Sequence, residues 1–304
     1  MDNVCHTLVG AAFGEAGLKR RTRFGNATLM IAANLPDLDV LVFATNTPSV
    51  AFRRGWTHGV IAQALLPLLL TGIMVLVARR RPAAAGPPLH AGWLLAIAYL
   101  GVYSHVLLDL LNNYGVRLLA PLEWRWFYGD SVFIVDPWLW LTLGTGIWLA
   151  RRRPSLAPAR YALMLAGCYI AAMVLSARLA REIVIDAWQG THAEAPRALM
   201  VGPEPVTPLR RAVIVDAGDH YQTGTFTWLP TAVTFSPATV PKNDQRPEVA
   251  EARRAPNVQA FLVWSRFPSW TLEPVPGGTL VTVTDMRFMA TGGRFSASTL
   301  VRHP

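Results

Sequence analysis

A histidine and an aspartate lie four residues apart inside an apolar stretch that is long enough to cross a membrane. The stretch covers residues 92–111 and reads GWLLAIAYLGVYSHVLLDLL, with His105 and Asp109 near its end. On a helix this spacing places both side chains on one face. An Asp at the centre of a bilayer costs roughly 2.5–3.5 kcal/mol on insertion scales, so ionisable residues there mark functional sites. An imidazole and a carboxylate on adjacent turns can bind one cation, although a buried His–Asp hydrogen bond between two helices would use the same pair.

Other His and Asp residues lie in or beside apolar segments and could join this pair. The predicted metal ligands are His6, Asp37, Asp39, His58, His105 and Asp109. Asp37 and Asp39 follow Pro36 inside an apolar run. On a helix their side chains would diverge by about 200°, so only one of them faces the site unless the helix breaks at Pro36.

Each of these candidates also has a purely structural interpretation. Asp37 and Asp39 could form a solvated turn at a helix end, and His6 could be a core histidine with satisfied hydrogen bonds. His58 could be an interfacial histidine beside a tryptophan anchor, with the neighbouring arginines extending to lipid headgroups. Further along, Asp136 precedes a proline, which is also the pattern of a helix start.

The composition is that of a membrane protein. Of the 304 residues, 52% are hydrophobic and only 15% are charged, which is typical of membrane chains. The net charge of +9 comes from short basic blocks between apolar runs, a pattern that indicates membrane topology better than nucleic-acid binding. The two cysteines, Cys5 and Cys168, predict neither a disulfide nor a Cys-based zinc site.

Six segments are predicted to cross the hydrocarbon core, which is about 30 Å thick. They are residues 4–17, 26–44, 60–78, 92–111, 132–150 and 161–179. The first is short and the second is broken, so that these two could form a tilted helical hairpin. With the basic blocks in the cytoplasm, the positive-inside rule places both termini outside it. The candidate ligands then share one depth, in the outer half of the membrane.

The sequence changes character in its last third. Pro, Thr and Gly become frequent, and residues 212–215, 221–228, 259–264 and 278–285 are typical of strands. The predicted fold is therefore an α-helical membrane bundle of about six spans over residues 1–186, followed by a β-rich soluble domain over residues 187–304 on the extracytoplasmic side.

Four short motifs resemble those of the YdjM-like family of inner-membrane metal-dependent hydrolases. They read Asp2-Asn3-x-x-His6-Thr7, Leu35-Pro36-Asp37-Leu38-Asp39, Arg54-Gly55-x-Thr57-His58 and His105-x-x-Leu108-Asp109, all within about residues 1–150. Their order is also similar to that in zinc-dependent phospholipase C and P1 nuclease, which are helical enzymes with a zinc cluster. A further His and a His-x3-Glu pair of that group have no counterpart here. The resemblance therefore implies fewer zinc ions, or Asp130 and Asp136 as substitute ligands.

These observations predict a metal-dependent hydrolase embedded in the bacterial inner membrane. A divalent metal, zinc, would activate a water molecule, with Asp39 or Asp130 as general base. Arg54 would bind an anionic group of a lipid or lipid-linked substrate, such as a phosphoester. The expected partners are the lipid bilayer and this substrate, with no nucleic acid, and the oligomeric state is left open. The alternatives are a metal or proton transporter and a membrane-anchored binding protein whose β domain holds the ligand.

Overall fold

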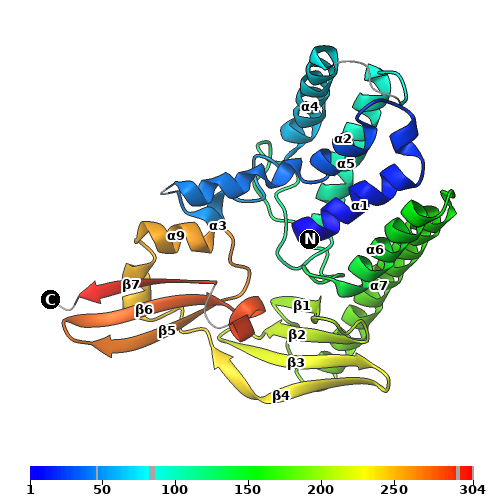
Figure 1. Cartoon of the computed structure of the whole chain (residues 1–304). Helices are drawn as coiled ribbons and strands as arrows, with labels where there is room; N and C mark the ends of the chain where they lie inside the picture. The colour runs from blue at the N-terminus through cyan, green and yellow to red at the C-terminus, as the bar shows by residue number, and fades with distance from the viewer. Residues whose placement is uncertain (46, 82–85, 292–294, 303–304) are drawn as a thin grey trace. The chain divides into compact units, whose positions relative to one another are not determined.

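The computed structural model describes residues 1–45, 47–81, 86–291 and 295–302 (Figure 1). Within them the chain divides into two compact units. The first, residues 1–41 and 53–176, is helical, and the second, residues 42–52 and 177–304, contains two β-sheets. A helical N-terminal half and a C-terminal β-sheet region are therefore confirmed. The second unit also includes a short segment before residue 53, which the sequence did not predict.

The first unit is built from helices that pack around two apolar cores. Its elements are α1 (Asn3–Glu15), η1 (Leu18–Arg20), α2 (Gly25–Ala32), the first part of η2 (Leu35–Ala44), α4 (Val60–Arg80), α5 (Ala91–Leu110), α6 (Pro137–Arg152) and the first part of α7 (Ala157–Gln189). One core lies between α1, α6 and α7, with Leu139 and Leu143 fully buried. The other lies between α2, α4 and α5 around Leu29 and Leu94. Helix α5 contributes Leu94, Ile97, Ala98 and Val102 to the second core.

Helices α2 and α5 approach closely because Gly101 of α5 has no side chain. A Cβ at this position would lie 3.0 Å from the amide nitrogen of Ala33 and 3.1 Å from the carbonyl carbon of Ala32. Such distances to backbone atoms would force the two helices apart. The glycine therefore sets the separation between α5 and the chain that follows α2.

Three helices of the described chain are long and apolar enough to cross a membrane, namely α4, α5 and α7. Helices α2 and η2 bend by 52° at a short break and could together form a fourth span. Helices α1 and α6 have 13 and 16 residues, or about 20 and 24 Å of helix, which is less than the hydrocarbon thickness. The predicted count of six spans is not confirmed.

Helix α6 is shorter than its apolar run because Asp136 fixes where it begins. The Asp136 carboxylate accepts hydrogen bonds from the amides of Trp138 and Leu139 at 3.0 and 3.1 Å, as an N-cap does. Pro137 occupies the first helical position, where its missing N–H has no cost. The helix thus starts five residues later than the predicted span.

The second unit holds two antiparallel sheets. One has the order β1 (Ala198–Pro203), β2 (Arg210–Asp216), β3 (His220–Trp228), β4 (Thr231–Pro241), and the other β5 (Pro268–Val275), β6 (Gly278–Asp285), β7 (Ser296–Arg302). Its short helices are α3 (Ser49–Phe52), α8 (Pro247–Ala252), α9 (Pro256–Leu262) and η3 (Met286–Thr291). In the first sheet's core, Val184 and Trp188 at the end of α7 pack with Val213 and Phe226.

One strand prediction in this unit is wrong. Residues 259–264 were expected to form a strand, but most of them lie in α9. Pro256 begins this helix at its first position, and Val258 and Phe261 are buried three residues apart, which is helical rather than strand spacing.

Candidate metal site

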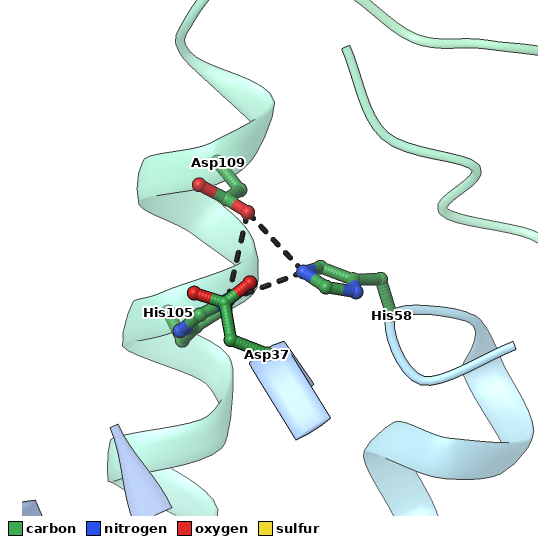
Figure 2. A group of neighbouring side chains, drawn as sticks. All are labelled: Asp37, His58, His105 and Asp109. Atoms are coloured by element: carbon green, nitrogen blue, oxygen red, sulfur yellow. Dashed lines mark hydrogen bonds and ion pairs between the residues drawn. The ribbon is translucent and has the colours of Figure 1, made fainter. Parts of the chain in front are cut away.

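Four buried side chains from three segments of the first unit point toward one another (Figure 2). Asp37 comes from η2, His58 from the turn before α4, and His105 and Asp109 from adjacent turns of α5. One ligand atom of each lies within 4.8 Å of the others. All four residues are at least 95% buried. Two of the four residues, His105 and Asp109, are the pair that the apolar stretch predicted to share one face of a helix.

The distances among His58, His105 and Asp109 are close to those around a tetrahedral metal ion, and Asp37 lies slightly farther away. His58 Nε2 lies 3.2 Å from both His105 Nε2 and Asp109 Oδ2, and His105 Nε2 lies 3.5 Å from Asp109 Oδ2 and 3.8 Å from Asp37 Oδ1. Zinc bonds of about 2.0–2.2 Å give tetrahedral ligand separations of roughly 3.3–3.6 Å. Two imidazole nitrogens and two carboxylate oxygens are a donor set that zinc accepts.

The histidines are held with their Nε2 atoms facing the group. His105 Nδ1 lies 2.8 Å from the carbonyl oxygen of Ala33. A carbonyl can only accept, so Nδ1 carries the proton and Nε2 presents its lone pair. His58 Nδ1 lies 3.0 Å from Thr57 Oγ1, which in turn donates to Asp39 Oδ2 at 3.2 Å. This chain of hydrogen bonds fixes the same tautomer in His58.

The protonation state of His58 also suits a metal ligand. Burial lowers the pKa of its imidazole below the usual value, although the carboxylates of Asp109 and Asp39 act in the opposite direction. The ring is therefore neutral near pH 7, which is the form that binds a metal.

Asp39 lies behind His58 rather than among the four ligands. Its Oδ2 accepts a hydrogen bond from the amide of Arg54 at 2.7 Å, and its Oδ1 accepts one from Arg53 Nε at 3.4 Å. Asp37 and Asp39 diverge because they lie on a 3₁₀-helix, where a two-residue step turns the side chain by about 240°. One aspartate faces the ligand group, and the other faces the turn that carries His58.

Arg54 is buried against Asp109. Its Nη2 donates to Asp109 Oδ1 at 2.9 Å, and its Nη1 donates to Asn112 Oδ1 at 3.1 Å. Its guanidinium lies 4.7 Å from the centre of the Tyr114 ring. The Met1 amino group also contacts Asp109. The positive charge of Arg54 is therefore balanced by a proposed ligand.

His6 lies beside the group and Asp130 lies outside it. The His6 ring stacks on His105 with 3.8 Å between centroids, and its Nε2 is 3.5 Å from Asp109 Oδ1. Asp130 follows α5 in the chain with a left-handed backbone, φ 47°, and the next amide, of Ser131, donates to the Leu111 carbonyl at 2.8 Å. Neither residue supplies an atom to the four-ligand group.

Two contributors to the site were not predicted. Ala33 acts through its backbone carbonyl, for which no side-chain pattern exists. Tyr114 provides the aromatic face under Arg54, and its one signal in the sequence is its place five residues after Asp109.

Comparisons with known proteins agree with a membrane location. Residues 1–180, which include every candidate ligand, match the sequence model of a family described as YdjM inner membrane protein. The uncharacterized protein YfhP of Bacillus subtilis (strain 168) is 22% identical over 304 residues, covering 96% of this chain and 88% of that protein. No solved structure gives a significant match. The similarity to phospholipase C and P1 nuclease is not shown.

Proposed function

The chain belongs to the YdjM inner membrane protein family, and from its buried His–Asp group we propose that it is a metal-dependent hydrolase. Asp37, His58, His105 and Asp109 would hold the metal, and the donor set favours zinc. The observation that carries this proposal is the close approach of four buried ligand atoms: four of their six separations are 3.2 to 3.8 Å, and all six are within 4.8 Å.

A bound metal would lower the pKa of a coordinated water toward about 7 and polarise the scissile bond. The protein residues then position the ligands and move protons. Asp39 holds the turn of His58 through Thr57 and the Arg54 amide, and Arg54 holds Asp109. Both oxygens of Asp39 accept hydrogen bonds, which argues against Asp39 as the general base, and we propose His6 as a further ligand.

The substrate we propose is a lipid or lipid-linked phosphoester. Membership of an inner-membrane family supports it, and so do exposed apolar residues next to the site's loops. Trp56 is 53% exposed, Leu122 80% and Trp124 44%, and aromatic side chains of this kind are enriched where protein meets lipid headgroups. We propose that this side of the molecule faces away from the cytoplasm, which the distribution of the basic blocks supports.

The test measures metal content and turnover in the same preparations. Wild-type protein should carry about one zinc ion per chain by elemental analysis and should hydrolyse a member of a panel of phosphoester lipids. His105→Ala should lose both together, because it removes a ligand from a four-ligand site. His90→Ala, an exposed histidine at the start of the same helix, should retain both. A metal-loaded and active His105→Ala variant would contradict the proposal.

A metal or proton transporter is the second candidate. Two of the ligands, His105 and Asp109, lie on a helix that can cross a membrane, and intramembrane His and Asp also form ion pathways. Metal uptake into proteoliposomes that requires His105, in protein that hydrolyses none of the lipids, would favour this function over the first.

A further inference from the structure

Arg117, in the loop between α5 and α6, is a buried cation with little to balance it. The residue is 5% exposed, and within the described chain neither its Nε nor its Nη2 donates a hydrogen bond. Two other buried arginines are different: Arg54 binds Asp109 at 2.9 Å, and Arg287 binds Asp285 at 2.8 Å. No carboxylate of a described residue lies at ion-pair distance from Arg117.

Burying such a group is unfavourable unless something compensates. A guanidinium does not lose its proton in proteins, and a buried unpaired charge is costly. Burial lowers the pKa of Arg117, with Tyr128 and Tyr114 acting in the opposite direction, so its surroundings disfavour the charged form. Its guanidinium lies 4.5 Å from the centre of the Trp126 ring and 5.3 Å from that of Trp124. These cation–π contacts compensate only in part, because an aromatic face carries no net charge.

The loop that carries Arg117 is joined to the candidate site. The amide of Arg117 donates to the carbonyl of Arg54 at 2.9 Å, and Arg54 in turn binds Asp109. An isolated antiparallel bridge, with 3.0 and 2.9 Å hydrogen bonds between Val116 and Phe127, closes this loop. The backbone of Arg117 is thus hydrogen-bonded directly to Arg54, the arginine that holds a proposed metal ligand.

The two unpaired nitrogens define what Arg117 can bind. Nε and Nη2 lie on one edge of the guanidinium, and two parallel N–H groups on this edge match two oxygens of a phosphate. We propose that Arg117 binds the phosphate of the substrate, either a lipid headgroup phosphate or a free phosphate group. The inference rests on the proposed function and deepens it: Arg54 is committed to Asp109 and Asn112, so Arg117 takes the anion-binding role that the sequence predicted for Arg54.

Equilibrium binding to purified full-length protein in detergent tests this inference. Two probes distinguish the sources of phosphate: inorganic phosphate, and dihexanoyl phosphatidylglycerol as a soluble phosphodiester lipid. Arg117→Gln should weaken binding of at least one probe tenfold or more. Arg117→Lys should restore it in part, since an ammonium supplies the charge without the two-nitrogen edge. Arg125→Gln makes the same charge change in the same loop at a side chain that is 64% exposed, and it should change affinity less than twofold.

Metal analysis of the same samples separates this inference from the proposed function. Equal metal content in Arg117→Gln and wild type, with weakened phosphate binding, supports it. Arg117-dependent binding in protein that carries no metal would remove the hydrolase proposal and keep only phosphate binding by Arg117. Wild-type affinity for both probes in Arg117→Gln would overturn it, and a lowered Tm with unchanged affinity would leave Arg117 a structural role only. If Arg117→Gln does not fold, unchanged affinity in Arg117→Lys overturns it instead.

Discussion

Asp37 and Asp39 are chemically identical and two residues apart, yet the backbone gives them different positions. Asp37 Oδ1 lies 3.8 Å from His105 Nε2, whereas Asp39 Oδ2 lies 3.6 Å from the opposite ring nitrogen of the other histidine, His58 Nδ1. The first can bind a metal directly. The second can only orient a ligand, and such outer carboxylates tune metal affinity by holding a ligand's tautomer and direction.

This difference predicts different effects of the two Asp→Asn substitutions. Asp39→Asn should weaken zinc binding by about 10–100-fold, the usual effect of losing an outer-shell partner, while saturating zinc still fills the site. Asp37→Asn should lower the zinc bound at saturation, because it removes a ligand charge. Titration against a chelator of known affinity measures both. Asp219→Asn, at a side chain that is 91% exposed, is the control, and equal losses in Asp37→Asn and Asp39→Asn would contradict the assignment.

At the residue scale, the sequence indicated the proposed metal ligands better than the proposed phosphate-binding arginine. His58, His105 and Asp109 could be recognised because ionisable residues are conspicuous in or beside apolar runs. Arg117 could not, since one arginine in a polar loop is ordinary. What distinguishes it are the rings of Trp124 and Trp126, brought over its guanidinium by the bridge between Val116 and Phe127. A two-residue bridge has no periodic pattern that a sequence could reveal.

At the scale of elements, the contact between α2 and α5 orients one of the proposed ligands, His105. Gly101 lets α5 approach the Ala32–Ala33 backbone, and one helical turn later His105 Nδ1 meets the Ala33 carbonyl at 2.8 Å. The orientation of a proposed ligand therefore depends on a glycine that has no chemistry of its own. Separating the two helices would break this hydrogen bond before it disturbed the ligands' own helix.

Gly101→Ala should therefore reduce both stability and metal affinity. The added methyl group must displace backbone, and overpacking of this kind costs about 1–3 kcal/mol. Gly92→Ala on the same helix has open space around its Cβ, and it should be neutral or stabilising by up to about 1 kcal/mol. Thermal unfolding and zinc titration of both variants provide the measurements. Wild-type zinc affinity in Gly101→Ala would show that the helix contact does not control the site.

The bounds of a helix could be predicted from the sequence where the length of an apolar run alone determines them. The spans predicted at 60–78 and 92–111 correspond to α4 at Val60–Arg80 and α5 at Ala91–Leu110. The sequence was less informative where a helix cap or a short-range turn determines the bounds or the type of an element. Asp136 shortened α6. Most of residues 259–264 form part of helix α9 instead of the predicted strand. The element η2 took a 3₁₀ conformation, whereas a helix that could break at Pro36 was expected.

At the scale of the whole molecule, the number of spans decides which side of the membrane the site faces. The topology predicted from the positive-inside rule has six crossings. Two of them would be α1 and α6, which are too short to span about 30 Å unaided. A short helix can still cross if the bilayer thins or if flanking residues extend to the headgroups. Helix α6 ends in Arg151 and Arg152, which favour a cytoplasmic end.

Single cysteines on either side of α6 test this topology in intact cells, in a background where exposed Cys168 is replaced by Ser. Leu122→Cys precedes the helix, and Leu229→Cys reports on the second unit; these positions are 80% and 78% exposed. Both should react with a membrane-impermeant maleimide, because they lie outside the cytoplasm in the six-span topology. Arg153→Cys, directly after α6, should react only in permeabilised cells. Labelling of both Leu122→Cys and Arg153→Cys in intact cells would mean that α6 does not cross, and the sidedness of the site would then have to be assigned from α4 and α5 alone.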